Sequence, residues 1–230
     1  MLAAKGMRFP IDIILVCIRW YAAYSLSYRH LEEIMQERGV FVDHSSINRW
    51  AVRFLPLLEK LFRKHKRQVG SSWRMDETYI KVKGTWKYLY RAVDKEGKTV
   101  DFLLTARRDK AAALRFFEKS MKTNGVPEKV TMDKSGANNA AMDEINARGD
   151  APIIVRQVKY LNNIVEQDHR AIKRVTRPML NFKSFRSAKN VLAGIELMHM
   201  IRKGQLLLEG GIEMSFADQF YALAGKIRLV

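Results

Sequence analysis

The sequence predicts an α/β protein, in which a mixed sheet flanked by helices follows a small all-α domain with a helix-turn-helix. Two observations lead to this prediction. Apolar residues recur with the helical period over residues 9–62, and the period changes to two from Trp73 onward. After three such β-like segments, helical and β-like segments alternate along the chain, which is typical of a mixed sheet with helices on its faces.

Three helices are predicted near the N-terminus, over residues 10–24, 28–39 and 44–62. Ser27 and Asp43 stand at N-cap positions, and Gly39 can end the second helix. In a helix-turn-helix the second helix enters the major groove, and its first polar residues face base edges. The expected DNA-binding residues are therefore His44, Ser45, Asn48 and Arg49. An ordinary three-helix bundle with a polar face is the alternative.

Residues 63–72, RKHKRQVGSS, are basic and then small, and they predict a solvated linker. Three strands of a meander follow, at residues 73–82, 86–94 and 99–107. The alternating segments after them predict helices at 109–125, 135–149, 162–174 and 184–206, and strands at 128–133 and 152–158. On the second strand, Trp86, Tyr88 and Tyr90 alternate and are expected in the core rather than in contact with bases.

The charge indicates a polyanionic partner. The chain of 230 residues has 41 Lys and Arg against 24 Asp and Glu, a net charge of +17. Such an excess favours nucleic acid, because cationic side chains release the counterions condensed on phosphate backbones. No apolar run reaches the roughly 18 residues of a membrane span, no signal peptide is evident, and Cys17 is the single cysteine. We therefore expect a soluble cytoplasmic protein without a membrane partner.

Three carboxylates stand out by position. Asp76 lies within the first strand, Asp133 ends the fourth strand, and Glu166 lies on a helix. If the first and fourth strands are neighbours, Asp76 and Asp133 lie side by side, and a helix over that edge can bring Glu166 to them. Clustered carboxylates suit two Mg²⁺ or Mn²⁺ ions, which support in-line phosphoryl displacement. The acids Glu77 and Asp101 are expected in hydrogen-bonding or surface roles instead.

The helix around Glu166 has two faces. At 100° per residue, Glu166 shares a polar face with Arg170 and Lys173, whereas Asp168 falls among apolar residues and is expected to accept a structural hydrogen bond. A salt bridge between Glu166 and Arg170 is the alternative to metal binding. Two Glu-x-x-His spacings, ending at His169 and His199, resemble di-iron bundles, but the strand-rich middle contradicts that architecture. No closed zinc-ligand set and no phosphate-binding glycine loop occur in the sequence.

Several motifs occur together in one order: HSSINRW, MDETYIKVKGTWKYLYRAVD, TVDFLL, MDKSGAN, RQVKYLNNIVEQDHRAIKR and GIELM. They resemble the insertion-sequence-six family of bacterial DDE transposases over about residues 8–206. The resemblance implies a ribonuclease-H-like core, the acidic triad Asp76, Asp133 and Glu166, and a basic residue at Lys173. The 33-residue interval from Asp133 to Glu166 is slightly short for the family. The implied domains are an N-terminal tail 1–8, a helix-turn-helix domain 9–62, a linker 63–72, a catalytic domain 73–206 and a C-terminal helix or tail 207–230.

The resemblance also implies an activity. Such an enzyme recognises terminal inverted repeats, cleaves the donor strand and transfers the freed 3′-OH to target DNA, typically giving cointegrates. It acts as an oligomer, at least a dimer, because two ends must be held together, and it associates with the nucleoid. In this reading Arg170 and Lys173 contact DNA phosphates. Two alternatives stay open: a non-catalytic helix-turn-helix regulator, and a nuclease that cuts without strand transfer.

Overall fold

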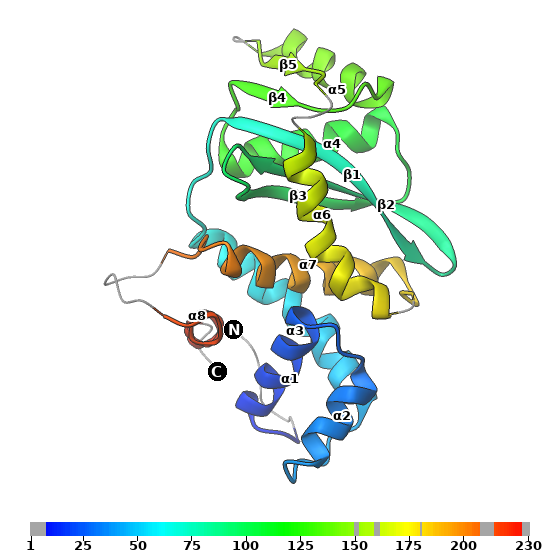
Figure 1. Ribbon diagram of the computed structural model, residues 1–230, viewed down its shortest axis with the longest axis vertical. Coiled ribbons are helices and arrows are strands. Elements are labelled where there is room, and N and C mark those ends of the chain that lie inside the picture. Colours follow the sequence, from blue (N-terminus) through cyan, green and yellow to red (C-terminus); the bar gives the residue numbers. More distant parts are fainter. Residues whose placement is uncertain (1–7, 150–151, 159–161, 180, 208–213, 227–230) are drawn as a thin grey trace. The chain divides into compact units, whose positions relative to one another are not determined.

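The computed structural model describes residues 8–149, 152–158, 162–179, 181–207 and 214–226 (Figure 1). Most of the expected tail 1–8 lies outside these ranges. Residues 150–151, within the interval from Asp133 to Glu166, also lie outside them. The chain forms two compact units. The helical unit comprises Met1–Arg67 and Ile172–Val230, and the sheet unit comprises Gln68–Ala171. Within the described residues, no helix is both long and apolar enough to span a bilayer.

The helical unit contains α1 (Ile11–Ala23), α2 (Tyr28–Gln36), α3 (His44–Lys64), η2 (Arg177–Met179), α7 (Phe185–Arg202) and α8 (Phe216–Gly225). The predicted N-caps are confirmed: the Ser27 side chain accepts a hydrogen bond from the His30 amide, and Asp43 accepts one from the Ser45 amide. Gly39 has φ +72°, a left-handed conformation that glycine adopts without steric cost. These local signals fix where α2 ends and where α3 begins.

Helices α3 and α7 form the core of the helical unit. At Gly194 a β-carbon would stand 2.5 Å from a methyl of Leu55, so the absent side chain permits a close approach of the two helices. Asn190 also donates to the backbone carbonyl of Val52 at 2.9 Å. Helix α7 therefore packs within the helical unit, whereas the sequence assigned its residues to the domain 73–206. Its apolar residues surround the helix and find their partners on α1 and α3.

The expected linker 63–72 is largely structured. Helix α3 continues to Lys64, and Arg63 forms an ion pair with Glu59 one turn earlier. Lys66 pairs with Leu206 in an isolated antiparallel bridge, and the Arg67 amide donates to the Gln205 carbonyl at 2.8 Å. The backbone of this segment thus pairs with a distant segment, while its side chains are exposed or half-buried.

The sheet unit contains β1 (Ser72–Val82), β2 (Thr85–Asp94), β3 (Thr99–Thr105), α4 (Lys110–Asn124), β4 (Lys129–Thr131), α5 (Gly136–Arg148), β5 (Ile154–Arg156) and the first part of α6 (Asn163–Thr176). The strand order is β3-β2-β1-β4-β5. Strands β1, β2 and β3 form an antiparallel meander, and β4 and β5 run parallel to β1. The mixed sheet of a ribonuclease-H-like fold and the predicted pairing of the first and fourth strands are confirmed.

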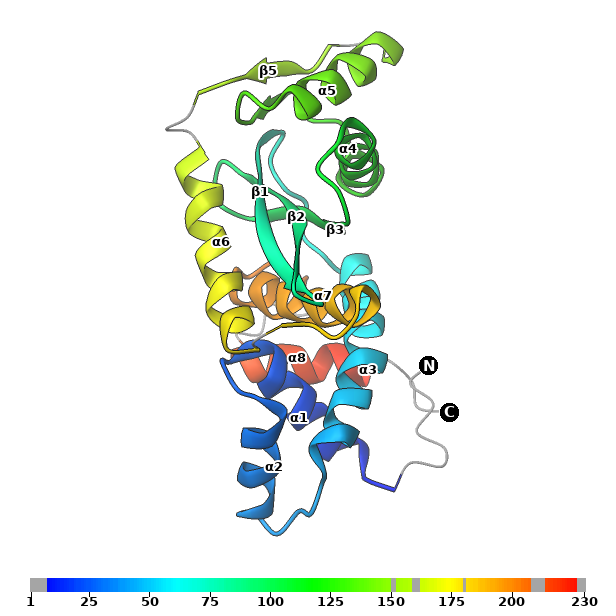
Figure 2. The same cartoon turned by 90° about the vertical axis from the view of Figure 1, so that its right-hand side faces the viewer.

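The two faces of the sheet have different covers. Figure 2 shows α4 and α6 on opposite sides of the sheet. The α4 side holds a hydrophobic core in which Trp73, Met75 and Tyr90 pack with α4 and α5 residues, among them Phe116 and Met142. The other side carries polar groups toward α6, described below. Alternation along β1 thus turns Asp76 toward α6, whereas Glu77 follows Met75 on the α4 side.

The prediction that Trp86 belongs to the core is wrong, whereas it is correct for Tyr90. Tyr90 is fully buried, but Trp86 is 57% exposed. The reason is that β3 pairs only with Tyr88 to Val93 of β2, so the start of β2 lies beyond the third strand. With β1 it forms a two-stranded extension, the hairpin arm (residues 79–88), which projects past the end of β3 (Figure 1).

Candidate active site

Three carboxylates meet where β4 ends beside β1. The parallel register pairs Thr131 with Arg74, and continuing it by two residues places Asp133 beside Asp76. Asp76, Glu77 and Asp133 each offer an oxygen, and these three oxygens lie within 4.8 Å of one another. All three residues are half-buried. We refer to them as the acidic cluster.

Two donors hold the acidic cluster together. A terminal nitrogen of Arg108 donates to Glu77 Oε2 at 3.1 Å and to Asp133 Oδ2 at 2.9 Å. From α5, the buried Asn138 donates to Glu77 Oε1 at 2.9 Å and to Asp133 Oδ1 at 3.3 Å. The guanidinium offsets part of the repulsion between carboxylates, and the amide fixes the distance between two of them.

Burial raises the pKa of Glu77 above its ordinary value. Hydrogen bonding from Asn138 and the charge of Arg108 act in the opposite direction, and the charges of Asp133 and Asp76 raise the pKa further. Glu77 therefore resists ionisation more than an exposed glutamate does. A divalent cation between these oxygens would relieve this penalty, because it favours the charged forms of all three.

On the opposite face of β1, Asp76 is oriented from α6. Its Oδ2 lies 3.2 Å from Nε2 of His169, and Nδ1 of His169 lies 3.4 Å from a terminal nitrogen of Arg91. Arginine only donates, so Nδ1 accepts and Nε2 carries the hydrogen that is donated to Asp76. The tautomer of His169 thus follows from its neighbours, and His169 is a positioning residue for Asp76.

A buried ion pair anchors the same helix to the sheet. The second terminal nitrogen of Arg91 lies 2.8 Å from Asp168 Oδ2, with side-chain exposures of 0% and 9%. Arg91 stands directly opposite Asp76 in the β1–β2 ladder. The expectation that Asp168 has a structural role on the packed side of the helix is confirmed, with Arg91 as its ion-pair partner.

Glu166 lies one turn before His169 on α6, about 4.5 Å along the axis at 1.5 Å per residue. Its side chain is exposed. Among the described residues, the carboxylates grouped with Asp76 and Asp133 include Glu77 and not Glu166. Nor does Glu166 pair with Arg170 within the described part of the chain, so the salt-bridge alternative has no support here. Arg170 is exposed and Lys173 is half-buried on the same helix.

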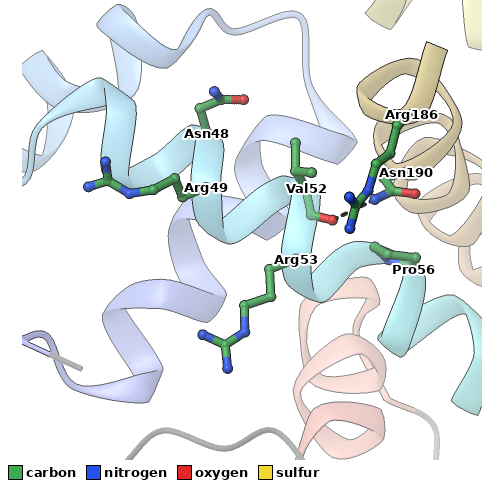
Figure 3. A pocket seen from close by; sticks show the side chains of 7 residues that line it. All are labelled: Asn48, Arg49, Val52, Arg53, Pro56, Arg186 and Asn190. Carbon is green, nitrogen blue, oxygen red and sulfur yellow. Dashed lines mark hydrogen bonds between the residues drawn. The ribbon is translucent and has the colours of Figure 1, made fainter. Parts of the chain in front are cut away.

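The predicted DNA-binding residues occupy the first turns of α3. His44 Nδ1 lies 2.8 Å from Glu32 Oε2, and the Ser45 hydroxyl donates to Asp43 at 3.1 Å. Asn48 and Arg49 instead line a pocket of about 450 Å³. Figure 3 shows this pocket between α3 and α7 and labels its lining: Asn48, Arg49, Val52, Arg53, Pro56, Arg186 and Asn190.

The pocket carries positive charge from two helices. Arg53 follows Arg49 by one turn of α3, and Arg186 comes from α7. None of the lining residues is acidic. The spacing of Arg49 and Arg53 could have been found in the sequence, because residues four apart share a helix face. Arg186 joins them only through the packing of α7 on α3.

Sequence reasoning missed four groups around the carboxylates. Glu77 was assigned a hydrogen-bonding or surface role; it does accept hydrogen bonds, from Arg108 and Asn138, but it also lies in the acidic cluster. The hydrogen-bonding role is confirmed for Asp101, which is buried and accepts from Lys119 at 2.5 Å. From the sequence, His169 was considered only as part of the Glu-x-x-His spacing of di-iron bundles. Arg108 and Asn138 carry no sequence signal, because each reaches the acidic cluster from a loop or helix remote from β1.

The contact between His169 and Asp76 predicts an effect on metal affinity. His169→Phe keeps the volume but removes the donor, and it should weaken Mn²⁺ binding by about 10- to 100-fold, as is usual for groups that orient a metal ligand. His169→Gln retains a donor and should recover part of the loss. Calorimetric titration with Mn²⁺ measures both. Equal affinities for wild type and His169→Phe would contradict the positioning role.

The raised pKa of Glu77 predicts how stability varies with pH in the metal-free protein. Below the unfolded-state pKa of about 4.3, Glu77 is protonated in both the folded and the unfolded protein, and its burial does not lower the free energy of unfolding through its charge. As the pH rises from the unfolded-state pKa to the higher folded-state pKa, the unfolded state releases its proton first. The free energy of unfolding therefore falls over this range. Glu77→Gln, which mimics the protonated side chain, should therefore gain stability relative to wild type between pH 4 and pH 7.

Urea unfolding in EDTA at several pH values measures this difference. Because any change in hydrogen bonding made by glutamine is the same at each pH, only the pH-dependent part reports the ionisation of Glu77. A difference that is constant, or that falls as the pH rises, would contradict the predicted direction.

The chain is similar to known proteins. The family model of a DDE domain matches residues 70–205. The transposase for insertion sequence-like element IS431mec of Staphylococcus aureus (strain Mu50) is 43% identical over 198 residues, which cover 85% of this chain and 87% of that protein. The transposase for insertion sequence element IS257 in transposon Tn4003 of Staphylococcus aureus is 42% identical, with the same coverage. Among solved structures, the HTLV-2 integrase catalytic core domain in complex with magnesium is similar with a TM-score of 0.46 and 14% identity, covering 58% of this chain and 88% of that one.

Proposed function

Because this chain belongs to the insertion-sequence-six family of bacterial DDE transposases, enzymes that cleave and join DNA with divalent metal, we propose that it acts on the terminal inverted repeats of its element. In this proposal it cleaves the donor strand at the repeat and transfers the freed 3′-OH to target DNA, giving cointegrates. The observation that carries the proposal is the meeting of Asp76 and Asp133 where β4 ends beside β1.

The residues of the acidic cluster suit Mg²⁺ or Mn²⁺. Carboxylate oxygens are the ligands these ions prefer, and three of them within 4.8 Å in half-buried positions leave room for substrate phosphate. Two ions, when bound, would supply activation of the attacking oxygen and charge stabilisation at the leaving oxygen. In the proposal Asp76, Asp133 and Glu166 would hold these ions.

The side chains around the metal ligands have separate tasks. His169 holds Asp76 in one orientation by donating from Nε2, and Arg91 sets the tautomer of that imidazole. Arg108 and Asn138 hold Asp133 in place. Since Glu166 is exposed one turn before His169, it is accessible to a DNA end bound at Asp76.

DNA is held by basic groups in each unit. Arg170 and Lys173 follow Glu166 on α6 and contact phosphates near the scissile bond in this proposal. In the helical unit, His44, Ser45, Asn48 and Arg49 at the start of α3 face base edges in the major groove. Arg53 and Arg186 extend the same charged pocket and fit phosphate contacts. The net charge of +17 supports extensive contact with the DNA backbone.

The reaction comprises two displacements. In the first, a water oxygen attacks the scissile phosphorus, and the P–O bond to the 3′ oxygen breaks to leave a 3′-OH. In the second, that hydroxyl attacks a phosphorus of the target strand and displaces its 3′ oxygen. Two element ends must be held together for paired transfer, so the proposal includes an oligomer of at least two copies.

The test uses labelled terminal-repeat DNA, a target plasmid and Mg²⁺ or Mn²⁺. We expect wild type to join the labelled end to the plasmid, and Asp133→Asn and Glu166→Gln to lose joining while still binding DNA. Asp143→Asn alters an exposed carboxylate on α5 and serves as the control. If the first two variants join strands as well as wild type, the triad assignment is wrong. Cleavage without joining would instead indicate a nuclease.

A further inference from the structure

The hairpin arm carries a row of aromatic side chains on one face. Tyr79 is 49% exposed and Trp86 is 57% exposed, and Tyr88 beside them is half-buried. The ring centroids of Tyr79 and Trp86 lie 6.4 Å apart at an interplanar angle of 77°, and those of Tyr79 and Tyr88 lie 5.5 Å apart. We call Tyr79, Trp86 and Tyr88 the aromatic row.

The two faces of the arm are unequal. Ile80 and Val82 point to the other face of β1 and are each 3% exposed. The arm therefore buries its aliphatic residues and leaves its largest rings in contact with water. Aromatic rings gain the most from burial, so a surface that presents two of them side by side is suited to a flat apolar partner.

The charge around the aromatic row identifies the kind of partner. The arm has the sequence YIKVKGTWKY, with lysines at 81, 83 and 87 and no acidic residue. The ammonium of Lys81 lies 5.8 Å from the centre of the Trp86 ring. Lysines interleaved with exposed rings match a strand of nucleic acid, whose bases stack on the rings while its phosphates meet the lysines. A duplex hides its base faces, so the match is to unpaired bases.

The aromatic row lies on the same face of the sheet as Glu77. Side chains two apart on a strand share a face, and Glu77, Tyr79 and Lys81 follow in that order on β1. Tyr88 stands opposite Tyr79, and Trp86 stands opposite Lys81. At about 3.3 Å per residue, Tyr79 is roughly 7 Å and Trp86 roughly 13 Å along the strand from Glu77. With about 3.4 Å per nucleotide, this span corresponds to roughly two to four nucleotides.

We propose that the aromatic row stacks on unpaired bases of the DNA end held at the acidic cluster, two to four nucleotides from the scissile phosphate. The inference rests on the proposed function, because that function places a DNA end at Asp76 and Asp133. The arm thereby favours an end whose terminal base pairs are open. Lys81, which shares the face of the aromatic row, holds a phosphate of the same strand.

The test compares two terminal-repeat duplexes, one fully paired and one with the last four pairs mismatched. A 2-aminopurine placed three nucleotides from the cleavage position reports stacking by loss of fluorescence. With wild type in Ca²⁺, we expect tighter binding of the mismatched duplex and quenching of the probe. Trp86→Ala and Tyr79→Ala should each weaken that binding about tenfold or more, with less than about twofold change for the paired duplex. Trp86→Phe should retain most of both signals.

Controls separate stacking from other roles of the arm. Tyr24→Ala removes an exposed ring elsewhere, 42% exposed in the helical unit, and should leave the preference for mismatched ends unchanged. If Trp86→Ala binds both duplexes like wild type and keeps the quenching, the proposal is overturned. It is also overturned if Trp86→Ala lowers the oligomer mass in sedimentation while the preference for mismatched ends persists, because the row is then a contact between copies.

The same assay distinguishes failure of this inference from failure of the proposed function. If wild type cleaves and joins terminal-repeat DNA but Trp86→Ala shows no loss on mismatched ends, the function stands and the stacking proposal falls. If wild type shows the quenching and its loss in Trp86→Ala but joins no strands, the stacking proposal stands and the function falls. Matching unfolding midpoints of the variants and wild type confirm that each variant is folded.

Discussion

Replacing Asp76 with asparagine is expected to lower the rate of DNA strand cleavage by about a thousandfold or more, without loss of DNA binding. Asparagine is nearly isosteric, and its carbonyl oxygen can still accept from Nε2 of His169, so the geometry around β1 is retained. What is lost is the negative charge that, in the proposed function, would hold divalent metal. Metal catalysis supplies several kcal/mol of transition-state stabilisation, and each 1.36 kcal/mol is about tenfold in rate.

Single-turnover cleavage of terminal-repeat DNA measures the effect, with DNA affinity and the unfolding midpoint as controls. A rate within about tenfold of wild type would contradict a role for Asp76 in metal binding. The comparison extends to the third carboxylate, since Glu77 lies in the acidic cluster and Glu166 does not. We expect Glu166→Gln to match Asp76→Asn and Glu77→Gln to lose far less. The reverse order would make Glu77 the third metal ligand and overturn the triad.

Replacing Arg91 with methionine is expected to destabilise the protein by about 3–5 kcal/mol. Arg91 is fully buried, and its removal takes away the positive charge that pairs with Asp168 at a position that is 9% exposed. The same change removes the donor to Nδ1 of His169. Attraction within the pair need not be strong for this result, because the penalty comes from the buried carboxylate that remains.

Urea unfolding of single and double variants tests this account. Adding Asp168→Leu to Arg91→Met should recover much of the loss, because both charges are then absent. Lys110→Met serves as the matched control: it breaks an ion pair with Glu144 at 2.8 Å, but Lys110 is 51% exposed, and the expected loss is below about 1 kcal/mol. Equal losses of unfolding free energy for Arg91→Met and Lys110→Met would show that burial does not determine the cost of breaking the Arg91–Asp168 pair.

The local parts of the fold could be predicted from the sequence because their causes are local. Ser27 and Asp43 cap helices through hydrogen bonds to amides within three residues, and Gly39 adopts a left-handed conformation that its own lack of a side chain permits. The strand order was partly accessible in the same way. A meander and then alternating helices and strands leave few arrangements, and β4 beside β1 is among them.

The candidate site also has a part that could be predicted from the sequence and a part that could not. Asp76 and Asp133 could be singled out because Asp76 lies within the first predicted strand and Asp133 ends the fourth. The parallel pairing of β1 and β4 then brings them together. The two faces of the helix around Glu166 separated it from Asp168 by periodicity alone. The groups that hold these carboxylates could not be found, because Arg108 lies 25 residues from Asp133 and His169 lies 93 residues from Asp76 in the chain. Asn138 is five residues from Asp133, but the Glu77 that it also contacts is 61 residues away.

Trp86 shows the limit most clearly. Alternation along β2 gives Trp86 and Tyr90 the same pattern, yet Trp86 is 57% exposed and Tyr90 is fully buried. Which of them is covered depends on where β3 stops and which helices pack on the sheet, and neither is encoded in the strand's own period. The sequence by itself determined the elements, their caps and two of the carboxylates, because these depend on neighbouring residues. Only the tertiary structure decided which side chains surround those carboxylates and which rings remain exposed, because both depend on contacts between distant segments.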